Sequence, residues 1–156
     1  KPENIMVTKA ADGTEKAVVM DFGLAKERKA GAELEKLTAT GIILGTPEFM
    51  SPEQLRGKPL DPRTDVYSLT LMTYEMLTGK LPFEGKNQQE MMIARLRSEP
   101  ISVRIRRPDI PEAVDKVLNK GMARNAEDRY PSAVDFSNDL TAAAGGGSVM
   151  GRLFGR

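Results

Sequence analysis

Two oxygen-bearing side chains near the start of the chain could hold a metal ion. Asn4 ends the sequence KPEN at positions 1–4, and Asp21 begins the sequence DFG at positions 21–23. The segment between them is typical of two strands and a turn, which would bring both side chains together. An amide oxygen and a carboxylate form half of the octahedral oxygen site that Mg²⁺ prefers when phosphates and water supply the rest. The pair therefore predicts a magnesium–phosphate site.

The composition is that of a globular domain and removes several kinds of chemistry. Charged residues make up 29% of the 156 residues, and the net charge of +1 implies no global field for nucleic acid or membranes. The chain has no cysteine and no histidine, which excludes disulfides, thiolate chemistry and imidazole proton transfer within it. No run is apolar enough over a sufficient length to span a bilayer.

The first half of the chain predicts a hairpin, a long loop and a short helix. β-branched runs at 5–8 and 17–20 flank Asp12-Gly13, a pair suited to a tight hairpin turn. Positions 23–46 are polar and without a sustained period, as in functional or mobile loops. The sequence SPEQ at 51–54 combines a capping serine with a proline at the first helical position, which predicts a helix ending near Gly57.

The second half predicts helices around a central one. A helix that starts at Asp61-Pro62 and stops at Gly79 is apolar on every face, which indicates a buried central element. An amphipathic helix should run from about Asn87 to before Pro100, and two more should start at Pro111 and Pro131. Their predicted inward residues are Val114, Val117 and Leu118 in the first, and Val134, Phe136 and Leu140 in the second.

The remaining stretches predict irregular structure. Positions 95–107 are rich in arginine and predict a loop, and the glycines at 145–147 start a flexible tail or linker at 144–156. The predicted fold is mainly α (α+β overall): one β-hairpin followed by about five helices around a central buried helix. The domain should span residues 1–143.

Three motifs in one order resemble the protein-kinase catalytic domain: KPEN at 1–4, DFG at 21–23 and GTPEFMSPE at 45–53. The sequence DVYSL at 65–69 and Arg129 extend the resemblance through position 143. The matching part of the family is the C-terminal lobe from the catalytic loop onward. SPEQ, DVYSL and LTGKLPFEG are most similar to the eukaryotic-like serine/threonine kinases of bacteria.

The resemblance implies ATP and Mg²⁺ as cofactors and assigns roles to four residues. Asp21 and Asn4 match the two metal ligands of the family, and Lys1 matches a lysine that contacts the γ-phosphate. Thr46 matches a threonine that faces the substrate. Lys1 and Thr46 together favour serine or threonine hydroxyls of proteins as acceptors. Taken singly, each has a plainer interpretation: turn residues for Asn4, Asp21 and Thr46, and a solvated surface lysine for Lys1.

Other residues match structural or regulatory positions of the family. Glu53 and Arg129 resemble an ion pair that fastens the activation segment to the late helices, and Asp65 resembles the aspartate that anchors the catalytic loop. Phe22 and Gly23 are interpreted as structural. Thr38 and Thr40 resemble autophosphorylation sites, with a solvated polar loop as the alternative. The five arginines at 95, 97, 104, 106 and 107 could dock an acidic partner, although such a run is more often a solvated face.

The family's catalytic base lies five residues before its asparagine, a position that precedes Lys1. The glycine-rich loop and the phosphate-pairing lysine of the smaller lobe are also outside these 156 residues. We therefore expect a serine/threonine kinase present as an N-terminally truncated, inactive fragment, whose central helix exposes apolar surface. The alternative is a non-catalytic binding or scaffold module. Expected partners are ATP and protein substrates, with no nucleic acid and no membrane within the chain. We expect a cytoplasmic location, with any membrane anchor of the parent protein following the tail.

Overall fold

The computed structural model describes residues 1–20 and 47–145. A 3₁₀ turn, η1 (Pro2–Asn4), leads into strands β1 (Ile5–Lys9) and β2 (Glu15–Val19). The helical part begins with the 3₁₀ turn η2 (Pro47–Phe49) and contains a further 3₁₀ turn, η3 (Ala126–Asp128). Its α-helices are α2 (Pro52–Leu55), α3 (Arg63–Thr78), α4 (Gln88–Arg97), α5 (Val103–Arg106), α6 (Glu112–Gly121) and α7 (Ala133–Ala143). The predicted mainly α fold with one hairpin is confirmed, with six α-helices in the described part rather than about five.

The hairpin forms where the sequence predicts it. Its strands pair antiparallel, with Ile5 opposite Val19 at the base. At the tip, the Asp12 carboxylate accepts hydrogen bonds from the Thr14 amide at 2.9 Å and the Thr14 hydroxyl at 2.6 Å. Gly13 adopts a φ of 82°, which glycine tolerates without the penalty that a Cβ atom brings. Local turn chemistry is therefore sufficient to close this hairpin.

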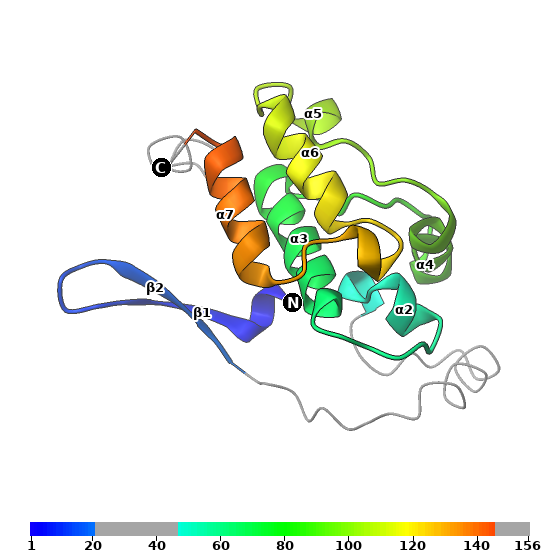
Figure 1. Ribbon diagram of the computed structural model, residues 1–156, viewed down its shortest axis with the longest axis horizontal. Coiled ribbons are helices and arrows are strands. Elements are labelled where there is room, and N and C mark those ends of the chain that lie inside the picture. Colours follow the sequence, from blue (N-terminus) through cyan, green and yellow to red (C-terminus); the bar gives the residue numbers. More distant parts are fainter. Residues whose placement is uncertain (21–46, 146–156) are drawn as a thin grey trace.

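The hairpin projects from the helices as an arm (Figure 1). Every residue of β2 is exposed, and within β1 only Ile5 packs against the hydrophobic core. The exposed apolar side chains of the arm include Val7 at 62% and Val19 at 53% of their maximal accessibility. The arm thus contributes almost nothing to the core of the described residues.

Helix α2 begins with the cap that the sequence predicts. The Ser51 hydroxyl accepts a hydrogen bond from the Gln54 amide at 3.2 Å, and the Gln54 side chain accepts one from the Ser51 amide at 2.8 Å. This reciprocal capping box satisfies two amides that a helix start leaves without partners. The chain leaves the helix at Gly57, whose φ is 63°.

Helix α3 is the central strut of the helical part. The Asp61 carboxylate accepts a hydrogen bond from the Arg63 amide at 2.8 Å at its start, and Gly79 ends it with a φ of 71°. Helices α6 and α7 pack against it and against each other (Figure 1). Its buried residues are Thr64, Val66, Tyr67, Thr70, Leu71, Met72, Thr73, Tyr74 and Leu77.

Burial of α3 is not complete on every face. Asp65 is exposed, and Met76 is 63% exposed. These two residues are eleven positions apart, which places them on one side of a helix with 3.6 residues per turn. The prediction of an all-round buried helix is therefore wrong at Met76, although Met72, which lies on the same side of α3, is buried.

Helices α6 and α7 show where periodicity succeeds and where it fails. Val114, Val117 and Leu118 are buried in α6, as predicted. In α7, Phe136 is buried, but Val134 is 67% exposed, so its predicted inward position is wrong. Phe136 and Leu140 share a face at a spacing of four residues, whereas Val134 precedes Phe136 by two and points about 160° away from it.

Helix α4 is confirmed, but the arginine-rich stretch after it is not only a loop. The Asn87 side chain caps α4 by accepting a hydrogen bond from the Glu90 amide at 2.9 Å. Helix α5 begins at Ser102, whose hydroxyl accepts a hydrogen bond from the Arg104 amide at 3.2 Å. The Asp115 carboxylate of α6 supports this start by accepting hydrogen bonds from the Val103 amide at 2.9 Å and the Ser102 hydroxyl at 2.8 Å. Since Asp115 is more than ten residues distant in sequence, local patterns do not predict its support of the Ser102 cap.

Candidate active site

The base of the hairpin fixes the backbone of Asn4. The Asn4 amide donates to the Lys1 carbonyl at 3.0 Å, closing η1, and the Asn4 carbonyl accepts from the Met20 amide at 2.7 Å. The second bond continues the ladder by one pair beyond Ile5 and Val19. Asn4 is therefore held level with the residue that precedes Asp21 in the sequence, while Asp21 itself lies outside the described residues.

The chemistry of Asn4 fits a site for Mg²⁺ only in part. Its side-chain amide offers one oxygen, and Mg²⁺ prefers oxygen ligands and retains several waters. Among residues 1–20 and 47–145, no three histidine, cysteine or acidic side chains gather into a metal-binding cluster. A site built on Asn4 would accordingly need oxygen ligands from elsewhere, such as Asp21 and phosphate.

Some of the other site residues predicted from the sequence lie within the described ranges, and some lie outside them. Lys1 is exposed at the start of η1, and Asp65 is exposed in the first turn of α3. Their roles at the γ-phosphate and the catalytic loop stay predictions. Residues outside the described ranges are Asp21, Phe22, Gly23, Thr38, Thr40 and Thr46.

Glu53 and Arg129 are brought together, although 76 positions separate them. Nη1 of Arg129 lies 2.7 Å from Oε1 of Glu53, and Nη2 lies 2.8 Å from Oε2. The Thr64 hydroxyl donates to the same carboxylate at 2.9 Å. Arg129 also donates to backbone carbonyls of Arg63, Ala123 and Arg124, so its guanidinium joins α2, α3 and the chain before α7.

The electrostatics of this pair follow from its burial. The Arg129 side chain is 0% exposed and that of Glu53 is 10% exposed. Burial alone would raise the pKa of Glu53, but hydrogen bonds from Arg129, the backbone and Thr64 outweigh it and lower the pKa to about 2. The pair is therefore ionised at neutral pH.

Sequence reasoning missed the role of Arg95. This residue of α4 is 2% exposed, and its guanidinium donates to the carbonyls of Pro47 at 2.7 Å, Glu48 at 2.6 Å and Met50 at 3.0 Å. The interpretation of the arginine run as a solvated face or an acidic-partner site is wrong for this position. Its signal in the sequence is its spacing: Arg95 follows Met91 by four residues, within the apolar stripe of α4.

Arg106 and Arg107 also serve the fold. Arg106 donates to the Leu81 carbonyl at 2.7 Å and pairs with Glu84 at 2.7 Å. Arg107 donates to the Leu77 carbonyl at 3.0 Å. These contacts tie α5 and the residue after it to the end of α3 and to the chain that follows α3, so neither side chain is simply solvated.

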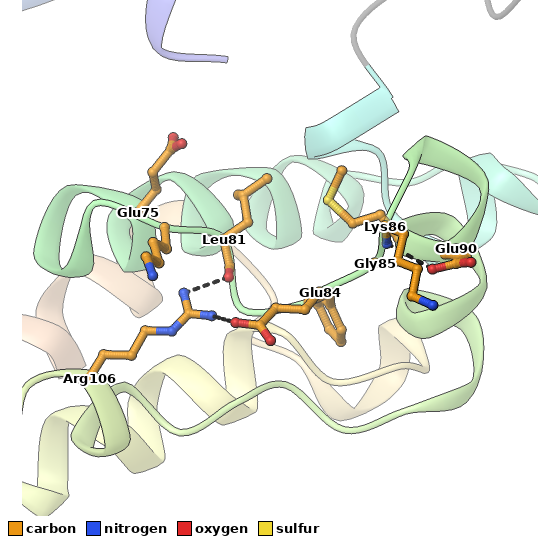
Figure 2. Close-up of a pocket in the computed structure, with 10 residues that line it drawn as sticks. Glu75, Leu81, Glu84, Gly85, Lys86, Glu90 and Arg106 are labelled. Atoms are coloured by element: carbon orange, nitrogen blue, oxygen red, sulfur yellow. Dashed lines mark hydrogen bonds and ion pairs between the residues drawn. The ribbon is translucent and has the colours of Figure 1, made fainter.

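An open hollow of about 700 Å³ lies between the end of α3, the start of α4 and Arg106. Figure 2 shows Arg106 reaching the Leu81 carbonyl and Glu84, with the Lys86 amide bonded to Glu90 on the opposite side. Its lining residues are Glu75, Lys80, Leu81, Phe83, Glu84, Gly85, Lys86, Glu90, Met91 and Arg106.

Glu75, which lines this hollow, is affected by acidic residues of η1 and η2. Partial burial raises the pKa of the Glu75 carboxyl, and the negative charges of Glu3 in η1 and Glu48 in η2 raise it further. The carboxylates of Glu3 and Glu48 are therefore close enough to Glu75 to disfavour its ionised form.

A hairpin, helices packed around a buried central helix, and a buried Glu–Arg pair are the arrangement that the resemblance to the C-terminal lobe of a kinase predicts. A family model described as the protein kinase domain matches residues 1–139. The chain belongs to the protein kinase domain family, within the eukaryotic-like serine/threonine kinases of bacteria.

Individual relatives agree with this assignment. The chain is 39% identical to the serine/threonine-protein kinase pkn3 of Myxococcus xanthus over 91% of its own length and 26% of the relative. It is 37% identical to the serine/threonine-protein kinase PknB of Mycobacterium tuberculosis, covering 94% of this chain and 22% of that one. The chain thus spans about a quarter of these relatives.

A solved structure supports the fold independently. The kinase domain of Mycobacterium tuberculosis PknI superposes with a TM-score of 0.61, covering 92% of this chain and 43% of that one at 23% identity. At that identity the likeness concerns the fold alone. No helix within the two described ranges is long and apolar enough to cross a membrane.

Proposed function

We propose that the protein containing this chain transfers the γ-phosphoryl group of ATP to serine or threonine hydroxyls of proteins. The single observation that carries the proposal is the bond from the Met20 amide to the Asn4 carbonyl, which holds Asn4 level with the residue before Asp21. The names of the relatives, all serine/threonine-protein kinases, support the acceptor class.

In this proposal each residue has a separate role toward ATP, which is highly charged, or toward the acceptor. Asn4 and Asp21 hold Mg²⁺, and Lys1 contacts the γ-phosphate. The bound metal supplies positive charge to the phosphate oxygens, and phosphoryl transfer depends on such charge and on positioning rather than on covalent help. Thr46 faces the acceptor hydroxyl, and Asp65 anchors the catalytic loop.

These 156 residues by themselves are proposed to be inactive. The resemblance places the catalytic base five positions before Asn4, which is outside the sequence given, and the nucleotide-covering loop is outside it as well. Thr38 and Thr40 are proposed as autophosphorylation sites because they lie between the DFG and GTPEFMSPE motifs. The segment is proposed to be cytoplasmic.

The test uses the full-length gene product that contains this chain, with radiolabelled ATP, Mg²⁺ and myelin basic protein as the acceptor. Asn4→Ala and Asp21→Asn should each lower the transfer rate by about 100-fold, because each removes charge stabilisation of the transition state. Glu112→Gln, an exposed change on α6, is the matched control and should leave the rate unchanged.

Three further measurements test the acceptor class, the activity of the wild-type protein and the proposed autophosphorylation sites. Phosphate should be found on serine and threonine of the acceptor, and label confined to tyrosine would contradict the acceptor class. A wild-type protein that transfers no phosphate would favour a binding module. Mass analysis of Thr38→Ala/Thr40→Ala should show the loss of phosphate from that loop.

A further inference from the structure

The buried guanidinium of Arg95 is bonded to backbone carbonyls rather than to a carboxylate. Three carbonyls of one short segment, those of Pro47, Glu48 and Met50, converge on its two terminal nitrogens at 2.6 to 3.0 Å. The same guanidinium also lies over the Phe83 ring, with its carbon 5.8 Å from the ring centre. Arg95 therefore lies between η2 and a residue that lines the 700 Å³ hollow.

This arrangement imposes a particular shape on η2. Carbonyl groups that point to one place repel one another unless a donor lies between them, and a planar guanidinium presents several donors in a fixed fork. A lysine offers a single compact charge and cannot reproduce that fork. A buried charge that faces carbonyl dipoles instead of a carboxylate is also costly, since burial removes its hydration. The contact of Arg95 therefore has a specific role in shaping η2 and does not merely fill space in the core.

We propose that Arg95 is a positioning residue for the protein substrate: it fixes Pro47–Met50, the segment directly after Thr46, in the conformation that receives the acceptor chain. This inference rests on the proposed function, in which Thr46 faces the acceptor. Since Arg95 contacts neither end of the hairpin, it acts on acceptor binding and not on the Asn4 side of the site.

The kinetic test measures KM for myelin basic protein and for ATP in the full-length gene product. Arg95→Lys and Arg95→Gln should raise KM for the acceptor by roughly tenfold and leave KM for ATP within twofold, because a displaced binding segment weakens only what it contacts. A merely structural role would reduce the active fraction, which lowers kcat and leaves both KM values unchanged.

Arg106→Gln is the matched control. It removes another arginine that donates to a backbone carbonyl and lies over an aromatic ring, that of Tyr74 at 5.6 Å, but its partners are in the loop at 81–84. Both KM values should stay at the wild-type level in this variant. An equal rise in acceptor KM for Arg106→Gln and Arg95→Lys would overturn the proposal.

Hydrogen exchange supplies a readout that does not depend on activity. The Met50 amide donates to the Pro47 carbonyl at 3.2 Å and should exchange at least tenfold faster in Arg95→Lys than in Arg106→Gln. A wild-type protein without phosphoryl transfer would refute the proposed function, whereas unchanged exchange and unchanged acceptor KM in an active enzyme would refute the role of Arg95. Unfolding of Arg95→Lys while Arg106→Gln stays folded would assign Arg95 to the core alone and would also overturn it.

Discussion

The arm at residues 1–20 and the helical part at residues 47–145 are stabilised in opposite ways. The arm is bonded almost entirely to itself, through its strand ladder and the turn around Asp12, and only Ile5 reaches the core. The helical part is joined by contacts between distant positions, above all those of Arg95 and Arg129. The predicted metal ligand Asn4 therefore lies on an element that is stabilised by contacts between residues close in sequence. This element is attached to the helical part, the frame, which is stabilised by contacts between residues distant in sequence. A change in one should therefore have little effect on the other.

The largest expected effect comes from breaking the Glu53–Arg129 pair from one side. Arg129→Met leaves the Glu53 carboxylate buried without its cation, which should lower the free energy of unfolding by about 3–5 kcal/mol. Urea denaturation followed by circular dichroism measures this loss. The double variant Glu53→Gln/Arg129→Met is the control and should recover part of the stability, because it removes the unpaired charge. A single variant as stable as the wild type would show that the frame does not depend on this pair.

Acid should weaken the same pair, with an effect of similar or smaller size. The folded-state pKa of Glu53, about 2, is lower than its ordinary value, so its contribution to stability is complete above pH 5 and disappears as the pH falls toward 2. The expected contribution at neutral pH is on the order of 3 kcal/mol. The difference in unfolding free energy between wild type and Glu53→Gln, measured from pH 7 to pH 2.5, should shrink across that window. A constant difference would contradict the assignment.

A smaller effect is expected where Gly121 at the end of α6 lies against Thr70 of α3. A Cβ atom at Gly121 would contact Thr70 Oγ1 and would lie 2.9 Å from Thr70 Cγ2. Gly121→Ala should therefore destabilise the helical part by about 1–3 kcal/mol through overpacking. Since Thr70→Ala removes both clashing atoms, the double variant should lose less than the sum of the single variants. If the double variant lost as much stability as the sum of the single variants, α3 and α6 could move apart at this position without a cost in free energy.

The smallest effect on the frame should come from the tip of the arm. Gly13→Ala places a side chain at a φ of 82°, which costs roughly 1–2 kcal/mol locally. Exchange of the Met20 amide should become faster, while the unfolding free energy of the helical part should change by less than about 0.5 kcal/mol. As a control, Lys16→Ala, an exposed change in β2, should alter neither the exchange rate of the Met20 amide nor the unfolding free energy of the helical part. A large loss of global stability in Gly13→Ala would show that the arm and the frame are one cooperative unit.

The sequence predicts well those features whose cause lies within a few residues. The hairpin turn at Gly13, the capping box at Ser51 and the end of α3 at Gly79 all have local causes, and the structure has all of them. Predictions fail where the partner is distant. The start of α5 is held by Asp115 of α6 in addition to its own cap at Ser102, and the guanidinium of Arg95 is bonded to carbonyls more than 40 positions away. The spacing of Arg95 from Met91 indicates an inward position on α4, but no local pattern identifies these distant partners.

The residues of the candidate site are predicted partly from the family resemblance and partly from the expected hairpin. The pairing of Glu53 with Arg129 came from the family resemblance, since no spacing rule joins residues 76 positions apart, and the structure contains it. The placement of Asn4 followed from the predicted hairpin. Val134 shows the limit of pattern reasoning, because an apolar residue at the wrong helical phase is exposed whatever its hydrophobicity. The predictions for Asp21 and Thr46 concern residues outside the described part.

The ladder of the arm has a consequence for how this region can vary in length. The register is fixed at the base by the pairing of Ile5 with Val19 and by the Met20–Asn4 bond, whereas the Ala10–Thr14 turn closes the far end independently. Residues added in symmetric pairs near Ala11 would lengthen the arm without shifting Asn4. The tip is accordingly a position where homologues can gain or lose residues and where a short reporter peptide can be inserted, while the geometry at the base stays as it is.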